Sequence, residues 1–470
     1  MTEESPLHDD PEVRQALAEV ERRPESARAW ARLGRLLFRR ARYEAAETAF
    51  RQQVQIAPDA PLGWANLALA LRRRFRPQEA MAAVRRALAR DPELPVARNH
   101  LAGILGDLGC YAEAVAVLRE LCTENPGAVA FQANLGNALR RLRRFDEAVP
   151  TLEACLRTDP SHPSHHWNLA IACFQAGDYR RGFHHAEWRT RRPGVRPPPW
   201  LDEAWKGEPV EGPVWLVTEQ GFGDAIQFVR FAEDVAARTG PVVVSTKSRL
   251  VPLLCTAPGV AQAVDSPPPP HVPRALLMSV PAALGYDVTN IGRARPYLQA
   301  DPARIQRWRT RLGPARGPRI GIAWQGNPKH PEDRHRSFPL AALAPLARIP
   351  DVTLISLQRN TDVHAPFAVR ALDATLDEDA AFVDTAAVMA NLDLVVACDS
   401  AVAHVAGAVG CPCFLALAYA PDWRWQPGEP TTPWYSNTRP FVQSQPGVWR
   451  DVFEAMAEAA MNGVLAPEIA

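Results

Sequence analysis

Hydrophobic residues in the first third of the chain recur with the spacing of paired helices. Leucine returns every 34 residues, each time followed by glycine or alanine: Leu33–Gly34, Leu67–Ala68, Leu101–Ala102, Leu135–Gly136 and Leu169–Ala170. Prolines keep the same period at Pro58, Pro92, Pro126 and Pro160. Leucine packs between helices, a small neighbour lets helices approach, and proline ends a helix. We therefore expect an α-helical solenoid of about five repeats over residues 27–192, after a lead-in helix within residues 1–26.

Further positions in phase with this period resemble the tetratricopeptide repeat (TPR). An aromatic residue recurs at Tyr43, Tyr111, Phe145 and Tyr179, with Pro77 in the remaining slot, and small residues recur at Ala46, Ala80, Ala114, Ala148 and Gly182. Arrays of this family bind peptides or other proteins in a concave groove, so the resemblance implies a protein partner. Use of the array as a dimer surface is the alternative, which would make the chain a homo-oligomer.

The residue before each repeat leucine forms a column of its own: Arg32, Asn66, His100, Asn134 and Asn168. Because the column is in phase, we expect it to line one groove. An asparagine amide can donate to and accept from an extended peptide backbone at once. The column is similar to the asparagine ladder of the O-linked N-acetylglucosamine transferases, which implies that Asn66, His100, Asn134 and Asn168 hold an acceptor protein. Asparagine at this position is also common in repeats of other function.

The pattern changes after a linker rich in proline, glycine and charge at residues 193–212. Short apolar runs now alternate with helical segments, which is typical of α/β folds with parallel sheets. The predicted strands are 214–218, 241–246, 275–280, 319–324, 352–357, 394–397 and 412–418, and the predicted helices are 225–238, 384–392, 401–409 and 449–461. The fold class is thus α plus α/β, with Rossmann-like domains at residues 213–315 and 316–445 and a C-terminal helix within 446–470.

One strand–turn–helix unit carries the strongest candidate chemistry. The strand ends at Asp399 and Ser400, Ala401 starts a small-residue helix, and His404 lies one helical turn beyond Ser400. Open α/β sheets bind ligands at the carboxyl ends of their strands. The unpaired amides at a helix start favour phosphate. The simpler interpretation is that Asp399 and Ser400 only cap the helix.

Two other turns follow predicted strands. The first, EQGFGD, brings Gln220, Gly221 and Gly223 before Asp224 at a helix start. Its glycines allow close backbone approach by a ligand, and Asp224 is either a helix cap or a general base. The second is a basic loop after the strand at 319–324. The polar side chains of this loop are Asn327, Lys329, Arg334 and Arg336. We expect them to bind a diphosphate together with Gln358, which ends the next strand. The alternative is a solvated surface loop.

Composition narrows the functional classes. The formal net charge of +1 argues against bulk electrostatic binding of nucleic acid or membranes. The N-terminus shows no apolar signal segment, and no apolar run approaches the length of a membrane span, so we expect a cytoplasmic protein without a transmembrane segment. The eight cysteines do not provide two Cys or His pairs at metal-binding spacing. This favours reduced thiols and predicts no metal site.

The two α/β halves suggest the GT-B glycosyltransferase architecture. Asp399-Ser-Ala-Val-Ala-His404 resembles the D-[ST]-x-x-x-H motif of the heptosyltransferases (glycosyltransferase family 9), Gly223-Asp224 resembles the G-D of that family, and Arg336 stands at its basic position before an aromatic–Pro pair. The whole chain resembles bacterial TPR-containing glycosyltransferases, through EQGFGDAIQFVRF, WQGNPKHPEDRHRSFPL, DLVVACDSAVAHVAGAVG, APDWRW and PWYS, over about residues 27–445. Arg336 replaces the usual lysine, which leaves heptose and ADP in doubt. Ala401 replaces the usual glycine, which should not block an NH contact.

The resemblance implies metal-independent, inverting transfer of a sugar from a nucleotide-sugar co-substrate, with no cofactor. The amides of Ser400 and Ala401, helped by Arg336, Lys329 and Asn327, would hold the diphosphate. Asp399 would bind sugar hydroxyls, His404 phosphate or sugar, and Asp224 would act as the base. The expected acceptor is a Ser or Thr hydroxyl of a flagellin-like protein. A saccharide or lipid-linked acceptor, or a non-catalytic TPR scaffold, are the alternatives.

Overall fold

The computed structural model describes residues 10–292, 295–330, 332–359, 363–426 and 431–464. It divides into two compact units, Met1–His165 and His166–Ala470. The outermost parts of the predicted terminal segments, residues 1–9 and 465–470, lie outside the described residues, as does Pro331 of the basic loop.

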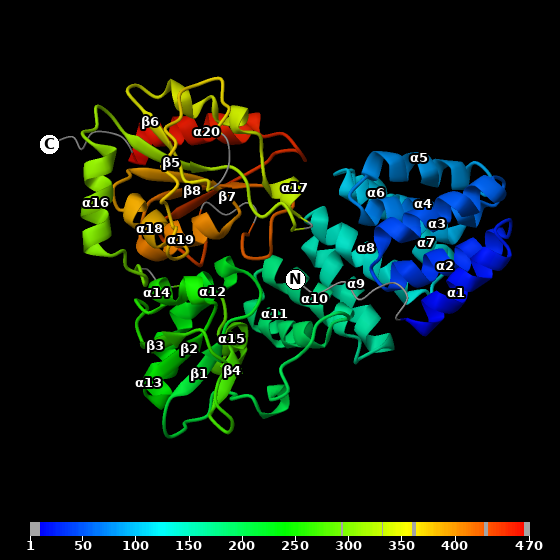
Figure 1. Cartoon of the computed structure of the whole chain (residues 1–470), viewed down its shortest axis with the longest axis horizontal. Coiled ribbons are helices and arrows are strands. Elements are labelled where there is room, and N and C mark those ends of the chain that lie inside the picture. Colours follow the sequence, from blue (N-terminus) through cyan, green and yellow to red (C-terminus); the bar gives the residue numbers. More distant parts are fainter. Residues whose placement is uncertain (1–9, 293–294, 331, 360–362, 427–430, 465–470) are drawn as a thin grey trace. The chain divides into compact units, whose positions relative to one another are not determined.

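The first unit consists of paired antiparallel helices (Figure 1). Their bounds are α1 (Pro11–Arg22), α2 (Ala27–Arg39), α3 (Tyr43–Ile56), α4 (Pro61–Arg73), α5 (Pro77–Leu88), α6 (Pro95–Asp107), α7 (Tyr111–Glu124), α8 (Val129–Arg141), α9 (Phe145–Thr158) and the start of α10 (Pro163–Gln175). With α11 (Tyr179–Ala186) of the second unit, α2 to α11 form the five predicted pairs. The helical solenoid is thereby confirmed, although α10 crosses the boundary between the units and the first unit ends before residue 192.

The turn inside each helix pair contains one residue with a left-handed backbone, and this residue also recurs every 34 positions. Its φ angle is 57° at Ala41, 59° at Phe75, 81° at Gly109, 61° at Arg143 and 84° at Gly177. A left-handed residue after a helix lets the chain turn back toward the partner helix. Glycine adopts this conformation without strain. The period in the sequence therefore reflects a repeated backbone geometry as well as repeated packing.

Two helical glycines of the repeats give opposite expectations for alanine substitution. A Cβ atom at Gly136 would lie 2.6 Å from Leu152 Cγ, whereas a Cβ atom at Gly106 would meet nothing within 4 Å. We expect Gly136→Ala to lower the free energy of unfolding by about 1–3 kcal/mol through overpacking. Gly106→Ala should raise it by about 0.5–1 kcal/mol because alanine favours the helix. Urea denaturation measures both, and equal effects would contradict this packing.

The second unit begins with a four-stranded parallel sheet of order β3-β2-β1-β4. Its elements are β1 (Val214–Val217), α12 (Phe222–Phe228), α13 (Ala232–Thr239), β2 (Val242–Ser245), α14 (Val251–Leu254), β3 (Val260–Val264), β4 (Arg274–Leu276) and α15 (Val280–Leu284). Short 3-10 turns are η1 (Glu187–Arg191), η2 (Leu201–Glu203), η3 (Val229–Phe231), η4 (Ser248–Leu250) and η5 (Leu277–Ser279).

A five-stranded parallel sheet of order β6-β5-β7-β8-β9 follows. Its elements are α16 (Pro302–Leu312), β5 (Arg319–Ala323), α17 (Asp333–Arg336), β6 (Thr353–Ser356), α18 (Val383–Met389), β7 (Leu394–Cys398), α19 (Ala401–Val409), β8 (Cys413–Leu417), β9 (Thr438–Val442) and α20 (Arg450–Ala459). The turns η6 (Leu340–Leu343), η7 (Leu346–Arg348) and η8 (Ala460–Val464) complete it. The predicted later part of parallel sheets and helices is confirmed.

The differences from the predicted elements have simple causes. Strand β3 was not predicted, and it is an edge strand with only one buried residue. Strand β9 was not predicted because it contains Pro440, which is tolerated at a sheet edge. The helix predicted at 225–238 begins at Phe222 and is divided by η3. Gly223 and Asp224 therefore belong to the first helical turn rather than to a loop.

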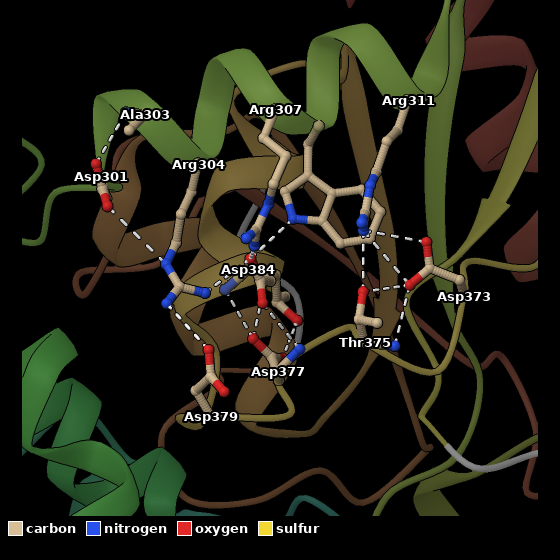
Figure 2. Close-up of polar contacts among 12 residues, drawn as sticks. Asp301, Ala303, Arg304, Arg307, Arg311, Asp373, Thr375, Asp377, Asp379 and Asp384 are labelled. Atoms are coloured by element: carbon tan, nitrogen blue, oxygen red, sulfur yellow. Dashed lines mark hydrogen bonds and ion pairs between the residues drawn. The ribbon is translucent and has the colours of Figure 1, made fainter.

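A buried aspartate fixes the segment that joins the two sheets of the second unit (Figure 2). Asp384 of α18 accepts hydrogen bonds from Arg304, Arg307 and Trp308 of α16. The Asp377 carboxylate accepts the backbone amides of Asp384 at 2.8 Å and Thr385 at 3.1 Å. These contacts hold residues 377–382 against the first sheet, where Phe382 packs edge-on against Phe222 with ring centroids 6.1 Å apart.

Of the helices in the described ranges, none is both long and apolar enough to span a lipid bilayer.

Candidate functional site

The order of the strands defines one binding crevice in each sheet. In the five-stranded sheet, β6 and β7 lie on opposite sides of β5, so the connections after β5 and β7 run in opposite directions. Open α/β sheets bind ligands at this switch point, outside the carboxyl ends of the strands. Asp399 and Ser400 follow β7, and the basic loop follows β5. In the four-stranded sheet the switch point lies between β1 and β4, where Gln220 and Gly221 follow β1.

The two switch points are joined by direct contacts between α12 and α19. A Cβ atom at Gly223 would lie 2.9 Å from His404 Cδ2 and 3.6 Å from the Ala401 Cα. Only glycine allows this approach without a shift of the histidine. The structure therefore brings Gly223, Asp224, Ala401 and His404 into one site, although they belong to different sheets.

Asp224 lies in the first turn of α12 and performs the capping role that the sequence allowed. Its Oδ2 accepts the backbone amide of Gly221 at 2.8 Å. Its Oδ1 accepts a hydrogen bond from the Arg424 guanidinium. The Asp224 side chain is 16% exposed, so solvent can reach the carboxylate. The general-base role stays a prediction, and any base function of Asp224 must operate beside a cation.

Arg424 is the central residue of this site and was not identified from the sequence. It donates to Asp224, to Asp422 at 2.8 Å and to Gln227 at 2.6 Å. Burial opposes its charged form, but the carboxylates of Asp422 and Asp224 outweigh burial and raise the pKa of Arg424. The sequence signals were the APDWRW motif and the position of this arginine between two tryptophans.

Asp399 is buried under the same segment. Its carboxylate accepts the Trp425 indole N–H at 2.9 Å. Burial, followed by the nearby Asp422 carboxylate, raises the pKa of Asp399 to about 6, against the opposing effect of Arg336. Asp399 can therefore exchange a proton near neutral pH, and its ionised form can accept hydrogen bonds from hydroxyl groups.

His404 is buried beside Asp399. Its Nδ1 is 2.9 Å from the Tyr435 hydroxyl, and its ring stacks on Trp425 with centroids 5.4 Å apart. Burial, and then the charges of Arg424, Arg230 and Arg336, lower the pKa of His404 well below its ordinary value. The imidazole is neutral at physiological pH, so His404 can supply a hydrogen bond but no positive charge. Trp425 and Tyr435 are buried in the domain, and both also contact site residues.

The start of α19 is not capped by a side chain. Ser400 occupies the N-cap position, as the capping interpretation expects, but its side chain makes no cap bond, so the ligand-binding interpretation stays a prediction. The Ser400 Oγ is buried and has no hydrogen-bond partner within the described chain. The first amides of α19, beginning with Ala401, keep the capacity to bind an anion that the sequence suggested.

The basic loop is only partly gathered at this site. Arg336 is half-buried, bonds to Asp333 at 3.2 Å, and acts electrostatically on Asp399 and His404. Lys329 and Arg334 are exposed, and Arg334 bonds to His335 instead. Their polar neighbours hold the loop itself: Asn327 accepts the Lys329 amide at 3.0 Å, and Gln358 accepts the Gln325 amide at 3.3 Å. Of the predicted cations, the structure places Arg336 beside the α19 turn.

A pocket of about 300 Å³ opens beside the β1 turn. Its polar lining comes from the ends of three strands: Thr218, Glu219, Gln220, Thr246, Lys247 and Asp265. Gln220 has a left-handed backbone with φ of 60°. Glu219 is held by the buried Arg189 through contacts of 2.6 Å and 3.2 Å. The predicted turn residues Gln220 and Gly221 therefore line a cavity.

The predicted column of the repeats contacts its neighbouring helices. His100 Nδ1 donates to the Ala65 carbonyl at 3.0 Å, and the Asn134 amide donates to Asn99 at 2.8 Å. The buried Nδ2 of Asn66 lacks a partner among the described residues, and Asn168 is half-buried in the second unit. His100 and Asn134 already have hydrogen-bond partners on the preceding first helix, so the structure does not show the predicted open groove lined by the column. Binding of an acceptor there remains a prediction.

His100 gives the repeats a pH-dependent stability. Burial lowers the pKa of His100 to about 4, while the unfolded value is about 6.5. Between these pH values the unfolded chain binds the extra proton, so stability falls as the pH falls, by up to about 1.4 kcal/mol per pH unit. We expect His100→Asn, which copies Asn66 and Asn134, to remove this slope. Urea unfolding of both proteins at several pH values from 5 to 7.5 measures it, and parallel curves would contradict the assignment.

Across the residues with described positions, no group of three or more His, Cys, Asp and Glu side chains has a geometry that could hold a metal ion.

Comparison with known proteins identifies the helical part. Residues 12–61, 64–129 and 134–181 match the family model described as tetratricopeptide repeat. Protein FlbA of Caulobacter vibrioides is 28% identical over 302 residues, covering 58% of this chain and 49% of FlbA. The chain thus spans about half the length of the curated relative it matches.

Two solved structures are similar to part of this chain. A thermophilic TPR protein of Thermus thermophilus, TTC0263, is 20% identical and covers 36% of this chain and 92% of its own, with a TM-score of 0.34. The structure of Pseudomonas aeruginosa pilF is 22% identical and covers 46% of this chain and 89% of its own, with a TM-score of 0.34. The family-model match shows that the chain contains tetratricopeptide repeats, and such repeats imply protein partners.

Proposed function

We propose that the second unit is a glycosyltransferase of the GT-B type that moves a sugar from a nucleotide-sugar donor to an acceptor hydroxyl. The proposal rests on the direct contact between the switch points of the two sheets. Asp224 of the four-stranded sheet lies against Arg424 and near His404 of the five-stranded sheet. A base on one side and an anion seat on the other suit transfer between two bound substrates.

The donor diphosphate would occupy the open start of α19. The amides of Ala401 and its neighbours, the buried Ser400 hydroxyl and the Arg336 guanidinium provide hydrogen bonds and positive charge there. Neutral His404 would donate or accept one hydrogen bond, and Asp399 would bind sugar hydroxyls. As the donor bond breaks, charge develops on the leaving nucleotide, and the helix dipole and arginines stabilise it.

Asp224 would then accept the proton of the attacking acceptor hydroxyl. We propose that the acceptor is Ser or Thr of a flagellin-like protein, because the chain also contains TPRs. A second contact through the repeats would raise the local concentration of the acceptor. Transfer to a saccharide or lipid-linked acceptor uses the same site without requiring the repeats.

A non-catalytic scaffold is the competing function, and the ion pair of Asp224 with Arg424 favours it, since that pair already occupies the proposed base. Incubation of the full chain with a panel of nucleotide sugars distinguishes the two. The transferase releases free nucleotide from one donor family, slowly with water and faster with an acceptor protein. The scaffold releases none above the protein-free rate.

A further inference from the structure

One face of α2 carries arginines at helical spacing. Arg28, Arg32, Arg35 and Arg39 follow each other at steps of four, three and four residues, which places them along one side of the helix. Arg73 stands 34 residues after Arg39, at the equivalent position of α4. All except Arg32 are exposed. We call Arg28, Arg35, Arg39 and Arg73 the arginine stripe.

The stripe lies on α2 and α4, the first helices of two successive repeats. Successive first helices contact each other directly, α2 with α4, α4 with α6 and α6 with α8. Arg32, in the middle of the stripe, reaches back to Glu19 at 2.7 Å and Gln15 at 3.1 Å of α1. The first helices line the concave surface of such solenoids, on which extended segments bind.

The stripe arginines lack the acidic partners that many other arginines of the first unit have. Within the part of the chain that is described, Arg28, Arg35, Arg39 and Arg73 form no ion pair and no side-chain hydrogen bond. By contrast, salt bridges engage Arg40, Arg51, Arg72, Arg74, Arg76, Arg98, Arg119 and Arg144. Uncompensated charges aligned on one face repel each other and attract an anion.

We infer that the arginine stripe binds an acidic peptide segment. Guanidinium groups bind carboxylates through paired hydrogen bonds. On α4, the positions equivalent to Arg28 and Arg35 are Leu62 and Leu69, and Leu62 is 46% exposed. The surface therefore fits acidic side chains on α2 and an apolar side chain on α4. Nucleic-acid binders typically neutralise about 6–10 phosphates, more than this stripe can contact. The inference does not depend on the proposed transferase.

Fluorescence anisotropy of a labelled peptide of alternating acidic and leucine residues tests the stripe on the full chain. We expect Arg28→Gln/Arg35→Gln/Arg39→Gln to weaken binding about tenfold, since each exposed ion pair contributes modestly. The matched control is Arg23→Gln/Arg85→Gln/Arg157→Gln, which removes the same charge from exposed arginines outside the stripe. It should change the affinity less than about twofold, because long-range effects are screened at physiological salt.

Three results would overturn the inference. Equal weakening in both triple variants would show a bulk charge effect. Tighter, stripe-dependent binding of a single-stranded oligonucleotide would assign the surface to nucleic acid. Unchanged peptide affinity in the stripe triple variant would show that the peptide binds elsewhere on the chain. Each full-length variant should unfold at the same temperature as the wild type. A difference in affinity then reflects binding rather than folding.

Discussion

Asp224→Asn is expected to reduce the rate of sugar transfer by about 10²–10⁴-fold, the usual contribution of a general base. The affinity for the donor should stay within about twofold of the wild type, because the proposed donor site is at the start of α19 and not at Asp224. Asparagine keeps the size of the side chain, but its single oxygen can replace only one of the two carboxylate oxygens that accept from Gly221 and Arg424 in the wild type. With the oxygen toward Gly221 the helix cap is kept, and Arg424 retains Asp422 and Gln227 as acceptors, so the fold should survive. Single-turnover kinetics with a saturating donor measure the loss as a change in rate.

Asp422→Asn is the matched control for this prediction. Asp422 also bonds to Arg424, at 2.8 Å, but it does not contact the α12 turn in the way that Asp224 does. We expect Asp422→Asn to lower the rate of sugar transfer less than about tenfold, because it changes only the electrostatic energy around Arg424. If both variants lose the same activity, the carboxylates act by balancing Arg424, and the assignment of Asp224 as the base is wrong.

Arg424→Met is expected to lower the free energy of unfolding by about 3 kcal/mol, because removal of one member of a buried ion pair leaves an uncompensated charge. Arg424 is 8% exposed, and its loss leaves Asp224 and Asp422 without their shared cation. Methionine retains much of the packing on Trp423, over which the guanidinium lies at 4.3 Å. Urea denaturation followed by tryptophan fluorescence measures the change.

Arg439→Met provides the comparison for Arg424. Arg439 lies on the same sheet in β9, is exposed, and stacks on Phe441 at 4.8 Å. Its replacement should change the free energy of unfolding by less than about 0.5 kcal/mol, as for most surface positions. A similar cost for the two variants would show that the ion pairs of Arg424 contribute little to stability.

The sequence was most informative where local rules determine the structure. The 34-residue period located the paired helices, and the small-residue run predicted α19 with the bounds Ala401–Val409 that the structure has. The strand before it was predicted because β7 is buried throughout and reads as a continuous apolar run. These features depend on residues that are close in sequence, so pattern and propensity suffice to find them.

The site could be predicted only in its separate parts. Asp224 and Arg424 are 200 residues apart and meet because two sheets pack together, which no local pattern encodes. The neutral state of His404 follows from burial and from three arginines on other elements. Lys329 and Arg336 looked equivalent in one basic loop, yet only Arg336 lies close enough to act on Asp399 and His404. Residue type showed which chemistry was available, and tertiary packing selected among the candidates.

Nucleotide binding decides whether the α19 turn and Arg336 form a donor site. Thermal unfolding of the full chain would be followed with a panel of nucleotides and nucleotide sugars, for the wild type, Arg336→Ala and Arg334→Ala. The exposed Arg334, which bonds to His335, is the matched control. We predict that one nucleotide family stabilises the wild type and Arg334→Ala by about 2.7 kcal/mol at 100 times the dissociation constant, and that Arg336→Ala loses this shift. No shift with any nucleotide, or equal shifts in all three proteins, would contradict the account.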